Sequence, residues 1–332
     1  MDKNLKESVK SVPLSYATCS IGNTPADTLP RKLEAISNAG FAAIELAFPD
    51  IINYGSQLLG HKIATDDYAE LVTVAKDIRQ LCEAKNLKKE KMHSQERKGW
   101  VEIMDAVETD ILQVGSTDIP VSELSKDPED IISDLRILCD LLARHNKRLA
   151  YENWCWSTHA PTWEDIWHIV AKVDRPNIGL CLDTFQTAGS EWGDPTTSSG
   201  RIMDASIEDL NRRFLESMNR LASTVPKEKI YLLQISDARK PQTPIENKRL
   251  DGLWPRARWS HDFRPMPYDG GYLPIEEVAR AVLKTGFRGW FSMEIFDGNA
   301  TTGTTEGMGD YAKRAMQSME RLLQSCEGVA GR

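Results

Sequence analysis

Short hydrophobic runs alternate along the chain with longer segments in which hydrophobic residues recur at helical spacing. The short runs predict buried strands, because a strand that is covered on both faces is hydrophobic without alternation. They span residues 13–19, 41–48, 111–115, 148–152, 178–183, 230–235 and 290–295. The longer segments predict amphipathic helices at residues 28–38, 66–86, 127–145, 162–173, 206–223 and 274–285.

This alternation of strands and helices indicates right-handed parallel β-α-β units. Seven clear strands, together with a doubtful strand that would be third in chain order, predict an α/β fold of the (β/α)8 TIM-barrel class. A doubly wound open sheet is the alternative, and it is disfavoured because no glycine-rich phosphate loop follows the first strand. We expect one domain over residues 1–332, with the barrel at about 13–300 and a C-terminal helix at about 310–326.

Oxygen-donor side chains lie at or near the ends of four consecutive predicted strands. They are Glu152, Asp183, Gln234 and Glu294. Functional residues of such a barrel gather where the strands end, and a carboxylate at the edge of a core is costly without a cation beside it. Carboxylate and amide oxygens are hard ligands, which predicts one divalent metal ion, Mg, Mn or Co. The alternative is that these acids form ion pairs with arginine or lysine.

The long segment after the seventh predicted strand carries several arginines and a histidine. Arg258 and Arg264 flank a compact aromatic segment and are candidates for binding a small anionic substrate, since the guanidinium fork matches a carboxylate. His261 lies between them and is a candidate general acid or base. Glu152 and Glu294 are the other catalytic candidates. Solvated arginines and a packing histidine are the alternatives.

Two more residues are candidates for contact with substrate. Glu45 lies near the end of the second predicted strand, as the metal-ligand candidates do in theirs, although an ion pair across the barrel mouth would also explain it. Trp154 follows the fifth strand and belongs to a group of aromatic residues that could wall off a small substrate or pack the loops.

Composition excludes some partners. The formal net charge of −8 disfavours nucleic acid and anionic membranes, and no hydrophobic stretch approaches the length of a membrane span. The six cysteines lack C-x-x-C spacing and suit free thiols in a reducing compartment. We expect a cytoplasmic protein that binds neither nucleic acid nor membrane, and a homo-oligomer is compatible with the sequence.

Four segments carry a resemblance to a known family: YENWCW at 151–156, LDTFQTAG at 182–189, LQISDA at 233–238 and WSHDFRP at 259–265. With them the chain resembles the xylose-isomerase-like TIM barrels and, within these, the fungal 3-dehydroshikimate dehydratases. The resemblance implies a metal-dependent lyase that converts 3-dehydroshikimate to protocatechuate in quinate breakdown. It implies the same four metal ligands, a metal ion that stabilises the enolate formed when the C4 proton leaves, and an arginine that holds the substrate carboxylate.

The sequence departs from these relatives in two places. Trp154 and Gln186 stand where some relatives have histidines, so the resemblance assigns no catalytic base. Residues 87–100, LKKEKMHSQERKGW, are short and highly charged where relatives have an apolar third strand and a catalytic loop. We therefore expect an abnormal or shortened third strand region. A sugar or keto-sugar isomerase or epimerase, and a catalytically impaired barrel kept for binding or regulation, are the alternative functions.

Overall fold

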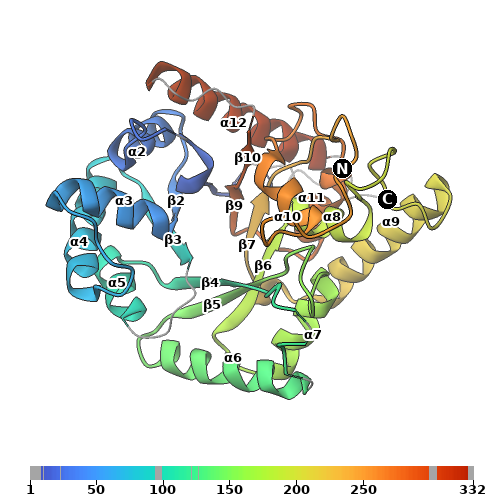
Figure 1. Cartoon of the computed structure of the whole chain (residues 1–332), viewed down its shortest axis with the longest axis horizontal. Helices are drawn as coiled ribbons and strands as arrows, with labels where there is room; N and C mark the ends of the chain where they lie inside the picture. Colours follow the sequence, from blue (N-terminus) through green and yellow to red (C-terminus); the bar gives the residue numbers. More distant parts are fainter. Residues whose placement is uncertain are drawn as a thin grey trace.

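The structure is a closed barrel of parallel strands. It is a computed structural model that describes residues 9–327 except 10, 23, 94–98, 121, 126 and 299–304. Neighbouring strands follow the order β1-β2-β3-β4-β5-β6-β7-β9, and β9 pairs with β1 to close the barrel (Figure 1). The strands are β1 (Leu14–Ala17), β2 (Ala43–Leu46), β3 (Lys88–His93), β4 (Ile111–Gly115), β5 (Arg148–Glu152), β6 (Ile178–Asp183), β7 (Ile230–Ile235) and β9 (Trp290–Met293). The TIM barrel expected from the sequence is confirmed.

Helices surround the barrel (Figure 1). They are α2 (Leu29–Asn38), α3 (Phe48–Leu59), α4 (Tyr68–Ala84), α5 (Trp100–Val107), α6 (Pro128–Ala143), α7 (Trp163–Val173), α9 (Ile207–Thr224), α11 (Ile275–Lys284) and α12 (Thr305–Cys326). Their hydrophobic faces pack on the outer side of the strands, as the helical spacing predicts. In the part of the chain that the structure describes, none of the helices is long and apolar enough to cross a membrane.

Local sequence signals explain where several helices begin and end. The Thr162 hydroxyl accepts a hydrogen bond from the Asp165 backbone at 3.2 Å, and the Asp165 carboxylate accepts one from the Thr162 backbone at 3.0 Å. This reciprocal capping box satisfies two donors that the first turn of α7 would otherwise leave without partners. After α2, Gly40 has a φ of +98°, a conformation that glycine adopts without steric strain.

The charged segment near Lys88 does supply the third strand. β3 pairs with β2 on one side and β4 on the other, with a register shift between Ile44 and Glu45. A parallel ladder is built from backbone hydrogen bonds, so charged side chains do not prevent it when their ends can reach water or a partner. Lys88 is exposed, and the Lys89 ammonium lies 3.9 Å from the Glu108 carboxylate. Residues 94–98 of the unusual segment 87–100 lie outside the described residues.

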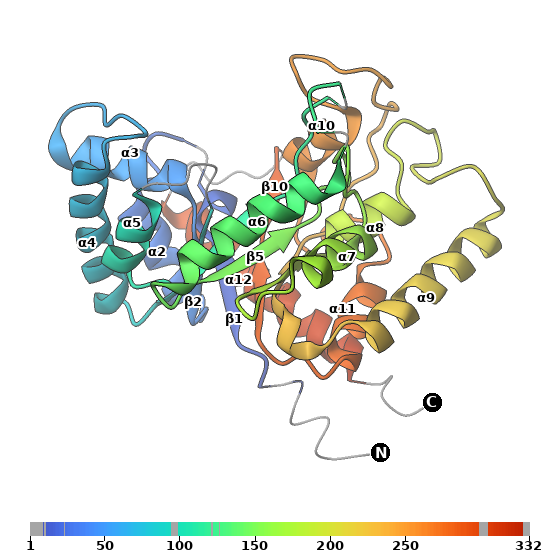
Figure 2. The same ribbon diagram turned by 90° about the horizontal axis from the view of Figure 1, so that it is seen from below.

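Besides α3 and α5, two short helices lie in segments that the sequence pattern did not mark as helical. α8 (Thr184–Glu191) follows β6 directly, and α10 (Pro255–Asp262) lies within the long segment after β7. α10 leads into β8 (Phe263–Arg264), which pairs antiparallel with β10 (Phe296–Asp297) after β9. Figure 2 shows α10 and the loop before it at the upper edge of the molecule. These elements stand over the carboxyl ends of the strands, where a barrel carries its functional site.

Candidate metal centre

Three carboxylates converge at the carboxyl end of the barrel. Glu152 ends β5, Asp183 ends β6, and Glu294 directly follows β9. One oxygen of each carboxylate lies within 4.8 Å of the others. The three residues are 3%, 0% and 5% exposed. The sequence therefore placed these acids correctly, because parallel strands end at the same edge of the barrel.

The electrostatics of this cluster favour a bound cation. The pKa of Asp183 is raised to about 6, because the effect of burial outweighs the lowering by the Arg264 guanidinium and the Glu294 carboxylate adds to the rise. The Asp183 carboxylate also accepts the Gln186 backbone N–H at 3.0 Å and thereby caps α8. Three buried carboxylates at this separation repel one another, and a divalent cation coordinated by their oxygens would relieve that repulsion. The donor set fits a hard divalent ion, which binds carboxylate oxygens.

Gln234 lies beside the carboxylates. It pairs with Asp183 in the β6–β7 register and is fully buried. Its amide nitrogen donates to the Glu45 carboxylate at 3.1 Å, and its amide oxygen accepts a contact from the Cys181 thiol at 3.2 Å. Glu45 comes from β2 and is also fully buried. The structure therefore brings both candidates into the same layer of the barrel interior.

Sequence reasoning missed three polar residues that support the site. Gln113 on β4 is buried and donates a short hydrogen bond to the Glu152 carboxylate. Ser236 and Ser260 accept hydrogen bonds from Arg264. Gln113 offered a signal, because it is the single polar side chain in an otherwise apolar strand, at the inward-facing spacing. The two serines gave none, since their position depends on how the loop after β7 folds.

Arg264 reaches the cluster, whereas Arg258 does not. The Arg264 side chain is 2% exposed, and its Nη2 donates to Asp183 Oδ2 at 2.5 Å and to Glu294 Oε2 at 3.1 Å. The Arg258 Nη2 instead donates to the backbone carbonyls of Glu246 and Lys248, at 2.6 and 2.8 Å. Arg258 thus stabilises the loop before α10, which differs from the substrate contact that its sequence position suggested.

The remaining candidates lie around the same end of the barrel. His261 is exposed in the last turn of α10. Trp154 is half-buried, and its ring stacks on Trp156 with centroids 5.5 Å apart. His159, another histidine of the β5 loop, accepts or donates a 2.9 Å hydrogen bond with Tyr151, and burial lowers its pKa. Within the described part of the chain, none of these three side chains forms a hydrogen bond with the carboxylate cluster.

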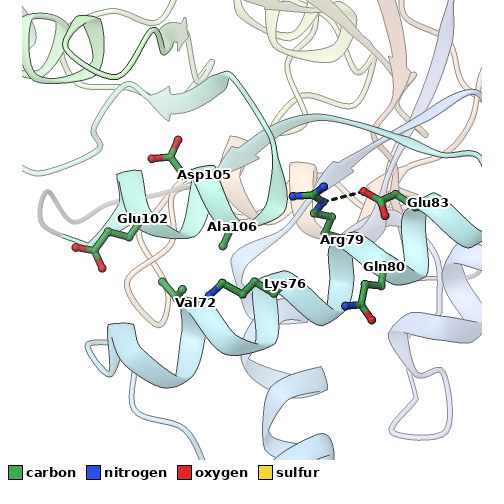
Figure 3. Close-up of a pocket in the computed structure, with 8 residues that line it drawn as sticks. All are labelled: Val72, Lys76, Arg79, Gln80, Glu83, Glu102, Asp105 and Ala106. Atoms are coloured by element: carbon green, nitrogen blue, oxygen red, sulfur yellow. Dashed lines mark hydrogen bonds and ion pairs between the residues drawn. The ribbon is translucent and has the colours of Figure 1, made fainter.

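A groove of about 650 Å³ lies elsewhere, on the outer surface between α4 and α5 (Figure 3). One of its charged side chains, Arg79, pairs with Glu83 at 2.7 Å and with Glu108 at 2.6 Å. The groove contains none of the converging carboxylates, and we therefore assign the functional site to the barrel end.

Comparison with known proteins agrees with this geometry. The profile of the xylose isomerase-like TIM barrel family matches residues 33–323. The chain belongs to this family. A 3-dehydroshikimate dehydratase from Neurospora crassa is 32% identical over 343 aligned residues, which cover 94% of this chain and 93% of the relative. A 3-dehydroshikimate dehydratase from Pseudomonas putida is 29% identical and covers 89% of this chain, but the match spans only 40% of that longer relative.

Solved structures share the fold. One of them is a crystal structure of the IOLI protein with a bound zinc atom, which aligns with a TM-score of 0.59 and 17% identity. The alignment covers 95% of this chain and 97% of that one. Identity at this level supports the shared barrel, and the chemistry of this chain has to be argued from its own residues.

Proposed function

We propose that the protein is a metal-dependent 3-dehydroshikimate dehydratase that forms protocatechuate. The observation that carries the proposal is the buried cluster of Glu152, Asp183 and Glu294 in a chain that matches a dehydratase of this name along nearly its whole length. Each of these acids ends a strand or directly follows one, in the part of a barrel that performs catalysis.

In this proposal Glu152, Asp183 and Glu294 hold one divalent ion, with the amide oxygen of Gln234 as the fourth protein ligand. Mg, Mn and Co are our candidates because every ligand is a hard oxygen donor. The bound ion would supply Lewis-acid polarisation of the substrate ketone. The Glu45 carboxylate fixes the amide of Gln234, because it accepts the hydrogen bond from Nε2.

Other residues would bind the substrate and move its proton. Trp154 presents a half-buried aromatic face beside the end of β5, where it would shield a ring-shaped substrate from water. His261 is our candidate for the base that removes the C4 proton, since it lies on α10 above the carboxyl ends of the strands. Loss of the C5 hydroxyl and aromatisation would then drive the reaction forward.

The biological setting is part of the same proposal. The likeness to a fungal dehydratase supports a role in quinate breakdown in a fungus. None of the six cysteines forms a disulfide, which supports a reducing, cytoplasmic location.

Incubation of the purified protein with Mg²⁺, Mn²⁺ or Co²⁺ and 3-dehydroshikimate should raise the absorbance of protocatechuate. The Asp183→Asn variant should lose more than about 100-fold in kcat/KM, because removal of a ligand should cost at least as much as removal of a group that supports one. Asp140→Asn is the matched control, since it removes an arginine-paired carboxylate on the outer surface.

A flat absorbance trace from folded protein with all three metals would contradict the proposal. Exchange of the proton next to the ketone without loss of water would identify an isomerase or epimerase instead. Metal binding without turnover of either kind would identify a catalytically impaired barrel.

A further inference from the structure

We propose that Arg264 is a positioning residue that fixes the carboxylates of Asp183 and Glu294 for metal binding, and that it does not bind the substrate carboxylate. The inference rests on the metal site of the proposed function. It changes the role that the sequence suggested for this arginine, and it follows from where each nitrogen of the guanidinium is bound.

A single nitrogen of Arg264 bridges two candidate ligands. Its Nη2 lies 2.5 Å from Asp183 Oδ2 and 3.1 Å from Glu294 Oε2, and it also donates to the backbone carbonyl of Glu294 at 3.1 Å. Asp183 ends β6, and Glu294 follows β9, with β7 between these two strands in the barrel. Arg264 thus joins two carboxylates whose strands are not hydrogen-bonded to each other.

The guanidinium is itself held firmly. Nε and Nη2 donate to the Ser236 hydroxyl at 3.0 and 2.9 Å, and Nη1 donates to the Ser260 hydroxyl at 3.2 Å. The rings of Phe185 and Phe296 lie 4.7 and 5.2 Å from the guanidinium carbon. Contacts of this kind fix the rotamer, so that the bridging nitrogen has a defined position.

These contacts leave little capacity for a substrate. A guanidinium has five N–H donors, and all three of its nitrogens already donate to groups of the protein. The side chain is 2% exposed. A substrate carboxylate could take two donors from one edge of the guanidinium only by displacing a serine or a candidate ligand, and displacement of a ligand would leave a buried charge without its partner, which is costly. These contacts therefore indicate that Arg264 links the two candidate ligands through its positive charge.

The two possible roles of Arg264, positioning the carboxylates and competing with the metal for them, predict opposite changes in metal affinity. If Arg264 orients the carboxylates, weakening its contacts should lower the affinity for metal, and groups that support ligands typically contribute about 10- to 100-fold. If Arg264 merely occupies the carboxylates in place of the metal, the same change should raise the affinity. Lysine keeps the positive charge and loses the planar fork, so Arg264→Lys separates geometry from charge.

The test is a calorimetric titration of the metal-free protein with Mn²⁺, together with the visible absorption spectrum of the Co²⁺-loaded protein, which reports ligand geometry. We expect Arg264→Lys to weaken Mn²⁺ binding by about 10- to 100-fold and to alter the Co²⁺ spectrum. Arg256→Lys is the matched control, because Arg256 donates to the Gly189 and Gly193 carbonyls and touches no candidate ligand. Its Mn²⁺ affinity and Co²⁺ spectrum should match those of the wild type.

A second variant protects the test against a folding failure. The pair Ser236→Ala and Ser260→Ala loosens the guanidinium but keeps its charge and both carboxylates, and it should weaken Mn²⁺ binding in the same direction. Unchanged or tighter binding in these variants overturns the positioning role. Absence of Mn²⁺ binding by the wild type overturns this inference and the metal site together. Binding that depends on Arg264, without formation of protocatechuate by the wild type, overturns the dehydratase proposal alone.

Discussion

Gly115 is where one added methyl group should disturb the site most directly. A Cβ at this position, at the end of β4, would lie 2.3 Å from Cζ2 and 2.4 Å from Cε2 of Trp154. Carbon atoms in ordinary contact are about 3.5–4.0 Å apart, so in Gly115→Ala the indole ring must retreat by about 1 Å or more. The ring cannot retreat freely, because it stacks on Trp156 and the Trp154 backbone donates to the Ser116 hydroxyl at 2.8 Å.

Overpacking of this kind costs about 1–3 kcal/mol, and we expect Gly115→Ala to lower the free energy of unfolding by that amount in urea denaturation. Because Trp154 lies two residues after Glu152, kcat/KM for 3-dehydroshikimate should fall as well. Gly309→Ala is the control: a Cβ there meets nothing within 4 Å inside α12, so the same chemical change should stabilise the protein by up to about 1 kcal/mol.

The Trp154→Leu exchange should relieve the clash, so the combined variant with Gly115→Ala should be more stable than the two single effects predict by addition. If Gly115→Ala unfolds at the same urea concentration as the wild type, the indole does not lie against β4, and the reasoning fails.

Two further predictions concern buried charges. The Lys32 ammonium is bound to Asp50 at 2.8 Å and to the Thr18 carbonyl at 3.0 Å, so Lys32→Met should cost about 3–5 kcal/mol in chemical denaturation, and Asp50→Leu in the same chain should recover most of it. Burial raises the pKa of Asp237 from 3.8 to about 6, so its protonated form stabilises the fold below about pH 4, and this contribution disappears as the pH rises through 6. A pKa shift of about two units corresponds to about 3 kcal/mol. From pH 4 to pH 7, the stability of Asp237→Asn relative to the wild type should therefore rise by about that amount. A stability difference that does not change with pH would show that Asp237 titrates normally.

The carboxylate cluster could be predicted because strand ends are visible in the sequence. Hydrophobic runs that end at Glu152, at Asp183 and next to Glu294 predict where each strand leaves the barrel. Once the fold class is known, parallel strands bring those residues together without further information. The helices α7 and α9 were predicted within one residue at each end, because Thr162 and Ser206 cap them at their first turns.

The surroundings of the cluster could not be predicted in the same way. Arg258 and Arg264 both lie close to Trp259 in the sequence, yet Arg264 is buried beside candidate ligands whereas Arg258 binds loop carbonyls. Their difference arises from the path of the chain between β7 and β9, where α10 and the β8–β10 pair form contacts distant in sequence. No local pattern encodes such a path, and α8 and α10 are too short for a helical period to reveal them.

The charged third strand has a different consequence from the one that its composition suggested. It lies in the half of the barrel that supplies no candidate metal ligand, but its two neighbours reach the site, since Glu45 of β2 binds Gln234 and Gln113 of β4 binds Glu152. The register runs from Glu45 to Lys91 and from Lys91 to Ile111, so β3 sets the height of Glu45 relative to Gln113 in the barrel. A shift of β3 by one residue would therefore move the partners of two candidate ligands. The strand with the least hydrophobic sequence thus helps to position the candidate metal ligands, through one hydrogen bond across the barrel interior and one between neighbouring strands.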